Sequence, residues 1–228
     1  MSPEKLIYKN DGKNLSETRG HCDLRSNKVR VMPDSTSSPS YSPFDAILDA
    51  VRAAAVEHVD STLLVGIDGA GGSGKSTLAK NLASEFNKAT VVHIDDFADW
   101  TDDSNWKLST FADRVLEPII AGITAKHQRY DWPTDTFGEW FEIVPNSIVI
   151  VEGVTALRPD LRDYWHVPVW VDCPRELRLE RGVARDGEAI RSKWEDIWMP
   201  GEDEYFKRDR PRESAMFIYD GSGEASTG

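Results

Sequence analysis

The chain has 228 residues, 39 % of them hydrophobic, so it can bury one good core, and we expect one domain with tails. Its formal net charge of −12 makes a nucleic-acid backbone an unfavourable partner. No apolar stretch approaches the length of a membrane span, no secretory signal follows the first charged residues, and two cysteines provide neither a disulfide framework nor a metal knuckle. These features predict a cytoplasmic protein without nucleic-acid or membrane partners.

The two ends of the chain differ in composition from its middle. Residues 1–42 are polar and end in a run of serines and prolines, which cannot bury enough apolar surface to offset the entropy of ordering. We expect them to be disordered. The folded domain is expected over residues 43–220, with Ser42 as a helix cap and Pro43 at the first helical position. Residues 221–228 are expected to form a flexible tail.

Between these limits, short apolar runs alternate with segments of helical periodicity. Helices are expected near residues 43–58, 75–87, 109–123 and 174–186, and strands near 62–67, 90–94, 147–151 and 167–171, with a further strand at 216–219. We expect Pro118 to kink or end the third helix. The alternation predicts βαβ units, and therefore an α/β fold with a mainly parallel sheet and helices on both faces.

The most informative segment, residues 69–77, matches the phosphate-binding pattern G-x-x-x-x-G-K-[ST]. Its glycines let backbone N–H groups turn toward phosphate oxygens, Lys75 supplies a cation, and the Ser76 hydroxyl can ligate Mg²⁺. The expected strand before it and helix after it give the context that the pattern needs. We therefore predict that the chain binds ATP through Gly69, Ala70, Gly71, Gly72, Ser73, Gly74, Lys75, Ser76 and Thr77.

Carboxylates follow two later strands, at the sheet edge where ligands bind in such folds. Asp95 is our candidate for the base that accepts the proton of a hydroxyl group. Asp96 and Phe97 are candidates for substrate binding, although Asp96 can also serve a metal shell, and both carboxylates can instead cap the next segment. Glu152, together with Ser76, predicts a Mg²⁺ site, because this ion keeps several waters and takes few protein ligands.

Four arginines share one face of the helix expected near 174–186, at positions 175, 178, 181 and 185. Arginines that close over a transferred phosphoryl group can stabilise its charge, so we predict this role for Arg181 and Arg185 and substrate binding for Arg178. The alternatives are a solvated helix face or pairing with acidic residues elsewhere in the chain. The spacing does not tell which arginine touches phosphate.

In their order along the chain, these features resemble the uridine kinase and phosphoribulokinase group of P-loop kinases. The resemblance runs from about Thr62 to Asp220 and includes Asp95–Phe97, Tyr130-Asp131-Trp132, Val151–Gly153 and the arginine helix. It implies a P-loop three-layer sandwich with a helical lid, and it implies that Tyr130 and Trp132 pack on a nucleoside. Residues 133–140 depart from the His-Ser-Arg segment of uridine kinases, and the Arg-Gly-Arg of their lid is absent.

We therefore expect an ATP- and Mg²⁺-dependent kinase that phosphorylates a hydroxyl of a small molecule, with a nucleoside as the first candidate. The altered segment 133–140 leaves a non-nucleoside acceptor open, such as a sugar acid, a vitamin precursor or an antibiotic. A regulatory ATP-binding module is a third reading, but such a module has no need for an alcohol-facing base like Asp95. The sequence is compatible with a homodimer and marks no interface.

Overall fold

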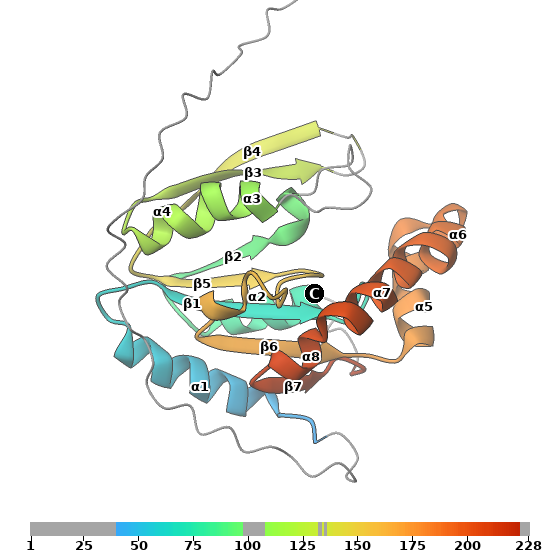
Figure 1. Cartoon of the computed structure of the whole chain (residues 1–228), viewed down its shortest axis with the longest axis horizontal. Coiled ribbons are helices and arrows are strands. Elements are labelled where there is room, and N and C mark those ends of the chain that lie inside the picture. Colours follow the sequence, from blue (N-terminus) through green and yellow to red (C-terminus); the bar gives the residue numbers. More distant parts are fainter. Residues whose placement is uncertain (1–39, 98–107, 132–133, 135, 224–228) are drawn as a thin grey trace, which may run out of the picture. The chain divides into compact units, whose positions relative to one another are not determined.

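A computed structural model describes residues 40–97, 108–131, 134 and 136–223, all within one compact unit, Pro39–Gly228. At the centre of this unit is a five-stranded parallel sheet in the order β2-β5-β1-β6-β7 (Figure 1). Its strands are β1 (Leu63–Gly69), β2 (Ala89–His93), β5 (Ile148–Glu152), β6 (Val167–Asp172) and β7 (Phe217–Asp220). The predicted α/β class and the five predicted strands are confirmed.

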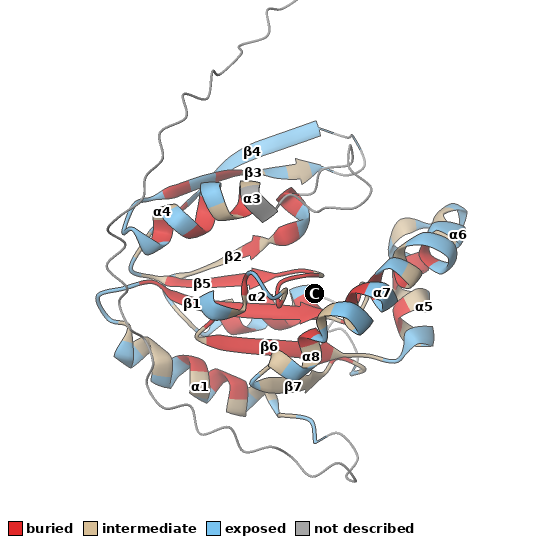
Figure 2. Cartoon of the chain, viewed as in Figure 1, coloured by how far each residue is buried: buried red, intermediate tan, exposed pale blue. Residues whose placement is uncertain are grey.

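Helices α1 (Phe44–Glu57) and α2 (Lys75–Ser84) pack on one face of the sheet. The strands bring alternate side chains to this face, because successive residues of a strand point to opposite sides. The apolar cluster there includes Ile47, Leu48 and Val51 of α1, Leu78 and Leu82 of α2, and Leu63, Val65, Ile67, Val167, Val169 and Val171 of the sheet. All seven residues of β1 are buried, as expected for a central parallel strand covered on both sides (Figure 2).

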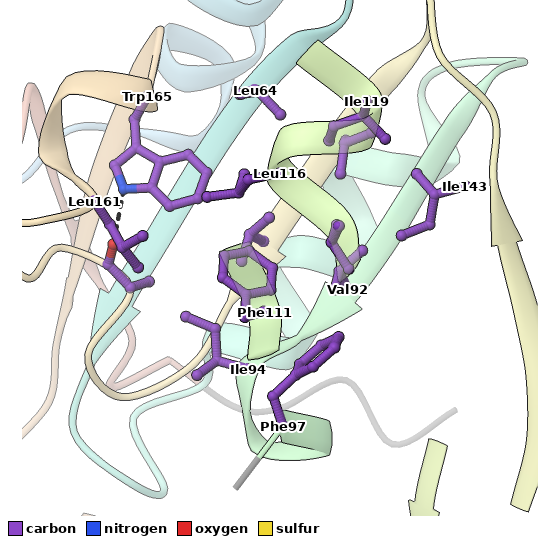
Figure 3. Close-up of a cluster of buried hydrophobic side chains, with 14 of the residues drawn as sticks. Leu64, Val92, Ile94, Phe97, Phe111, Leu116, Ile119, Ile143, Leu161 and Trp165 are labelled. Atoms are coloured by element: carbon purple, nitrogen blue, oxygen red, sulfur yellow. Dashed lines mark hydrogen bonds between the residues drawn. The ribbon is translucent and has the colours of Figure 1, made fainter. Parts of the chain in front are cut away.

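A second helical stretch covers the other face of the sheet. It comprises α3 (Leu108–Phe111), the π-helical turn η2 (Ala112–Leu116) and α4 (Glu117–Ile120). Figure 3 shows Phe111, Leu116 and Ile119 of this stretch beside Leu64 and Val92 of the sheet. The Trp165 indole N–H of the same cluster donates to the Ala156 carbonyl at 2.7 Å. The predicted three layers are therefore present.

Two local expectations concern helix ends. The helix continues past Pro118 and ends two residues later at Ile120, and the π-helical turn that ends at Leu116 rearranges the hydrogen-bond ladder near the proline, where an N–H is missing. The predicted Ser42 cap is wrong, because no side-chain hydrogen bond caps α1 and its N-cap residue is Pro43. The Ser42 backbone N–H instead donates to the Ile218 carbonyl of β7 at 2.7 Å, which ties the start of the domain to the sheet.

Two parts of the described chain were not expected. A separate antiparallel hairpin contains β3 (Ala125–Asp131) and β4 (Thr136–Ile143), and β4 is exposed up to its last residue, Ile143 (Figure 2). The second part follows α5 (Arg175–Asp186) and consists of η4 (Glu188–Ile190), α6 (Arg191–Lys193), η5 (Trp194–Trp198), α7 (Met199–Asp209) and α8 (Pro211–Ser214). In Figure 1, α5, α6 and α7 stand beyond the carboxyl ends of the strands.

The remaining described elements are two 3₁₀ turns, η1 (Ile94–Phe97) and η3 (Arg162–Tyr164). None of the helices in the described part of the chain is both long enough and apolar enough to cross a membrane. Three residues of the predicted tail, Gly221–Gly223, are held by hydrogen bonds from the Arg181 guanidinium to their carbonyls. The folded unit therefore extends past β7 to at least Gly223.

Candidate active site

The register of the sheet gathers the predicted site residues at one edge. Glu152, the last residue of β5, lies opposite Ile67 of β1 on one side and His93 of β2 on the other. Because these strands are parallel, the phosphate loop after β1 and the turn η1 after β2 begin at the same edge of the sheet. The predicted ATP-binding, metal and base residues therefore approach one another.

The phosphate loop has the strand–loop–helix setting that its pattern predicts. Gly72 has a φ of +74°, and a Cβ atom there would lie 2.6 Å from the Arg178 carbonyl oxygen, so a side chain is excluded at this position. Lys75 begins α2 and is buried, and its Nζ donates to the Ala70 carbonyl at 2.9 Å. The loop is thus folded around its lysine.

Ser76, Glu152 and His93 form a short hydrogen-bonded chain. The Ser76 hydroxyl donates to Glu152 Oε1 at 2.8 Å, and His93 Nδ1 lies 2.5 Å from the same oxygen. Burial of Glu152 opposes its ionisation, but the hydrogen bond from His93 and the nearby Lys75 charge outweigh burial and lower its pKa. The hydrogen bond to Glu152 in turn raises the pKa of His93. The sequence had suggested only a packed strand residue at position 93.

The predicted metal site consists of two hard oxygen donors, the Ser76 hydroxyl and an ionised Glu152 carboxylate, 2.8 Å apart. Within the described residues, no group of three or more His, Cys, Asp and Glu side chains could hold a metal ion. This sparse set fits Mg²⁺, which keeps most of its waters and takes one or two protein ligands alongside substrate phosphates. It does not fit an ion that requires a full protein cage.

Asp95 lies in the turn η1, between two residues that anchor the turn in the core. Ile94 and Phe97 are both buried in the cluster of Figure 3, whereas Asp95 is exposed. Although Asp95 reaches solvent, the protein around its carboxylate displaces enough water to raise its pKa to about 6, against the attraction of Lys75. The charge of Glu152 also raises this pKa. The predicted base is therefore within electrostatic reach of the phosphate loop and the metal site.

Asp96 forms its hydrogen bond with the hairpin. It is buried, and its Oδ1 accepts the Tyr130 backbone N–H at 3.1 Å, while its Oδ2 lies 3.9 Å from His127 Nδ1. Burial lowers the pKa of His127, whose ring contacts Phe97 with centroids 5.3 Å apart. The structure thus uses Asp96 and Phe97 to attach β3 to η1. Their role in substrate binding stays a prediction.

The predicted acceptor side is only partly within the described residues. The Tyr130 ring packs edge-to-face on Phe137 of β4, with centroids 5.4 Å apart, so both strands of the hairpin contribute aromatic rings. Trp132 lies outside the described residues. Nucleoside packing on Tyr130 and Trp132 therefore stays a prediction.

Two of the four arginines on this face of α5 are paired with acidic residues of α7, and such pairing was one of the alternatives that the sequence left open. Arg175 Nη1 binds Asp203 at 2.7 Å, and Arg178 Nη1 binds Glu202 at 3.1 Å, with both acids on α7. The first pair is exposed and the second is buried, so the second is the stronger constraint on structure. The Arg178 guanidinium is thus partly engaged by Glu202, and its role in substrate binding stays a prediction.

The other two arginines of this face differ in how far they are engaged. Arg181 donates to the carbonyls of Gly221 and Gly223, each at 2.7 Å, and approaches the Gly72 carbonyl at 3.4 Å. Arg185 is two-thirds exposed, forms two hydrogen bonds to its neighbour Asp186, and is within electrostatic reach of Asp95. Arg185 is thus better placed than Arg181 to reach a ligand.

Three further residues lie beside the phosphate loop, and the sequence did not indicate them: Asp68 at the end of β1, and Glu202 and Tyr205 on α7. Asp68, fully buried in β1, accepts hydrogen bonds from the Gly69 backbone N–H at 2.6 Å and from the Tyr205 hydroxyl at 2.6 Å. Glu202 accepts the Gly71 backbone N–H at 2.7 Å. A carboxylate at the end of an otherwise apolar strand was a usable signal for Asp68, because a buried charge requires partners.

Comparisons with known proteins show similarity of the chain to kinases. No protein-family model matches the chain. A curated uridine kinase from Clostridium perfringens is 27 % identical over 144 residues, which cover 54 % of this chain and 68 % of that protein. A uridine kinase from Latilactobacillus sakei is 26 % identical over 165 residues, covering 65 % of this chain and 76 % of that protein.

A solved structure agrees at the level of the fold. A possible uridine kinase from Bacillus stearothermophilus aligns with a TM-score of 0.55 and 21 % identity, covering 77 % of this chain and all of that chain. The resemblance predicted from the motifs is therefore confirmed in sequence and in fold, and these likenesses support an ATP-dependent kinase. The chain is thus similar in sequence to uridine kinases, and its fold is similar to that of a possible uridine kinase.

Proposed function

We propose that this protein transfers the terminal phosphoryl group of ATP to a hydroxyl of a nucleoside. The observation that carries the proposal is the convergence of Lys75, Glu152 and Asp95 at one sheet edge, where the charges of the first two act on the carboxylate of the third. The uridine kinase names of its sequence relatives support a nucleoside as the acceptor.

In this proposal each group has one task. The phosphate loop and Lys75 hold the triphosphate, and Ser76 and Glu152 hold Mg²⁺. When bound, Mg²⁺ neutralises charge on the phosphate oxygens. Asp95 accepts the proton of the attacking hydroxyl and holds that hydroxyl in line, and Arg185 stabilises charge on the transferred group.

Arg181 has a different place in this scheme from the one that the sequence suggested. Its guanidinium binds backbone carbonyls of the phosphate loop and of residues 221–223, so we propose that it holds these segments together. Cytoplasmic location, a homodimer and the absence of nucleic-acid partners stay predictions.

A second candidate keeps the chemistry and replaces the nucleoside by another hydroxyl compound. It is favoured by the hairpin, in which residues 133–140 depart from the uridine kinase pattern and β4 presents mainly exposed side chains. Recognition of a ring by Tyr130 and Phe137 does not by itself distinguish a nucleobase from another planar compound.

The experiment that tests the proposal is ADP release by the purified protein with Mg-ATP and a panel of nucleosides, sugar acids, vitamin precursors and aminoglycosides. We expect stimulation by a pyrimidine nucleoside and a phosphate monoester product. Stimulation only by another compound would transfer the proposal to the second candidate. ATP binding without stimulation by any compound in the panel would favour a regulatory ATP-binding module.

A further inference from the structure

Helix α7 contacts the phosphate loop through two buried polar side chains. Glu202 and Tyr205 are three residues apart and therefore share one face of the helix. Tyr205 donates its hydroxyl proton to Asp68, the residue before the loop, and Glu202 Oε1 accepts the N–H of Gly71 inside the loop. One face of α7 is thus hydrogen-bonded both to Asp68, directly before the loop, and to Gly71, within its first half.

The Asp68 carboxylate also forms hydrogen bonds with a segment outside the phosphate loop. Besides the Tyr205 hydroxyl and the Gly69 N–H, it accepts the backbone N–H groups of Thr155 at 3.3 Å and Leu157 at 2.8 Å. Both of these residues lie in the segment after Glu152. Asp68 therefore joins the entrance of the phosphate loop to the strand end that carries the predicted metal ligand.

The second oxygen of Glu202 connects the loop to α5. Its Oε2 accepts a hydrogen bond from Arg178 Nη1, and both side chains are more than nine-tenths buried. The Arg178 carbonyl lies directly against Gly72, and among the described residues Arg178 Nε has no hydrogen-bond partner. A single carboxylate thus fixes a loop amide and a lid arginine at the same time.

A carboxylate on a phosphate-loop amide can either hold the loop or compete with nucleotide phosphates. Two observations favour holding. The carboxylate is partnered, because Arg178 Nη1 donates to its Oε2 at 3.1 Å, and although burial raises the pKa of Glu202, Arg178 and Lys75 act against that rise. The loop also packs closely against this part of the fold, since a Cβ atom added at Gly71 would lie 2.8 Å from the Trp194 ring and 2.8 Å from Glu202 Oε1.

We propose that Glu202 is a positioning residue for nucleotide binding, which fixes the Gly71 amide and the Arg178 guanidinium in the arrangement that receives the triphosphate. The proposal rests on the proposed function only in requiring that the loop binds ATP. Glu202 does not contact the reacting atoms. It acts by keeping the loop in its binding conformation before nucleotide arrives, which reduces the ordering that binding must otherwise supply.

The test is calorimetric titration of full-length variants with a non-hydrolysable ATP analogue and Mg²⁺. Glu202→Gln keeps an oxygen for Gly71 but loses the charge that pairs with Arg178, so we expect about ten-fold weaker binding. Glu202→Ala loses both contacts, and we expect roughly a hundred-fold weaker binding. Glu204→Gln makes the same charge change at an exposed position of α7 and should leave affinity unchanged.

Two further measurements separate positioning from general destabilisation. Thermal unfolding without ligand shows whether each variant is folded at the titration temperature, and a purely structural role would lower that midpoint while the folded protein kept its affinity. In the double variant Glu202→Gln with Arg178→Gln, we expect about the same loss as in the more affected single variant, because the two side chains form one unit.

Wild-type affinity in folded Glu202→Ala would overturn the proposal, and so would tighter binding, which would mean that the carboxylate competes with phosphate. Analogue binding by the wild type that weakens in the variants, without turnover of any acceptor, would remove the proposed function and support this inference. Turnover of an acceptor by the wild type, together with unchanged analogue affinity in the Glu202 variants, would support the proposed function and overturn this inference. Absence of analogue binding by the wild type would overturn both.

Discussion

The nucleotide side and the acceptor side of this site are built in contrasting ways. The phosphate loop is surrounded by buried groups, with Lys75 folded onto the loop and Glu202 hydrogen-bonded to it. The hairpin β3–β4 carries exposed rings, Phe137 and Trp140, each about 60 % exposed. The groups proposed to bind the nucleotide are therefore fixed by contacts within the protein, whereas the rings proposed to face the acceptor are largely exposed to solvent.

The largest effect is expected on the nucleotide side, from Lys75→Met. This change keeps the apolar stem but removes the buried cation, so we expect ATP-analogue affinity and turnover to fall by about 10³-fold or more. Titration and coupled ADP release measure the two losses. Lys80→Met on the exposed side of α2 is the matched control, and an equal loss in that variant would show that α2 itself had been damaged.

The next largest effect is expected on the pH dependence of turnover, through the proposed base Asp95. A base must be ionised, and the pKa of this carboxyl is raised to about 6, so acceptor-dependent turnover should fall about ten-fold per pH unit on acidification below that value. Bound Mg²⁺ would lower this pKa toward its ordinary value of 3.8.

The pH profile of kcat/KM for the acceptor is the measurement. His93→Asn is a useful companion variant, because it removes the nearby titrating imidazole while keeping a donor for Glu152. In that variant the acidic limb should persist. A rate that stays constant down to about pH 3, below the ordinary pKa of an aspartate, would contradict the assignment of Asp95 as the base.

A smaller effect, on stability, is expected from the buried carboxyl of Asp68. Burial raises its pKa to about 6 from 3.8, so the folded state binds the proton more tightly than the unfolded state does. Stability contributed by the protonated form is therefore present at low pH and is lost as pH rises from about 4 to 6.

Asp68→Asn removes this titration and deprives the Leu157 N–H of its carboxylate acceptor. Relative to the wild type, the variant should be less stable, with a deficit larger at pH 5 than at pH 7.5 by on the order of 1 kcal/mol. Urea unfolding followed by tryptophan fluorescence measures this difference. A deficit that grows toward pH 7.5 would show that the Asp68 pKa is lowered rather than raised.

The smallest effect is expected on the acceptor side, from Phe137→Ala. Its ring contacts Tyr130, whose backbone binds Asp96 beside the proposed base, so we expect the acceptor KM to rise a few-fold while ATP-analogue affinity stays constant. Trp140→Ala is an equally exposed control, paired with Gln128 on β3, and should leave KM nearly unchanged. Equal effects of both changes on KM would show that Phe137 has no special role toward the acceptor. A change in ATP-analogue affinity would show that the hairpin also affects nucleotide binding.

The same contrast explains which parts were predictable from sequence. The phosphate loop and the parallel sheet were predictable because contiguous residues encode them, through glycine spacing and apolar strands of continuous burial. The hairpin was not, because β4 is exposed on both faces and shows no apolar–polar alternation.

Helix α7 escaped prediction for a different reason. Its buried positions are Met199, Glu202 and Tyr205, so two of its three buried side chains are polar and the helix gives no apolar periodicity. Glu202 and its partner Gly71 are 131 residues apart, and only the fold reveals that they meet. Arg178 and Arg181 were visible as members of a helical face, but their acceptors lie on α7, the phosphate loop and residues 221–223.

The most direct test of the account is to measure Asp95→Asn on both sides of the site. In one preparation, ATP-analogue affinity should stay within about three-fold of the wild type, while acceptor-stimulated ADP release should fall by about 10²-fold or more, because only the second process needs a proton acceptor. Unchanged ADP release in a folded Asp95→Asn protein would contradict the account and remove this aspartate from the mechanism.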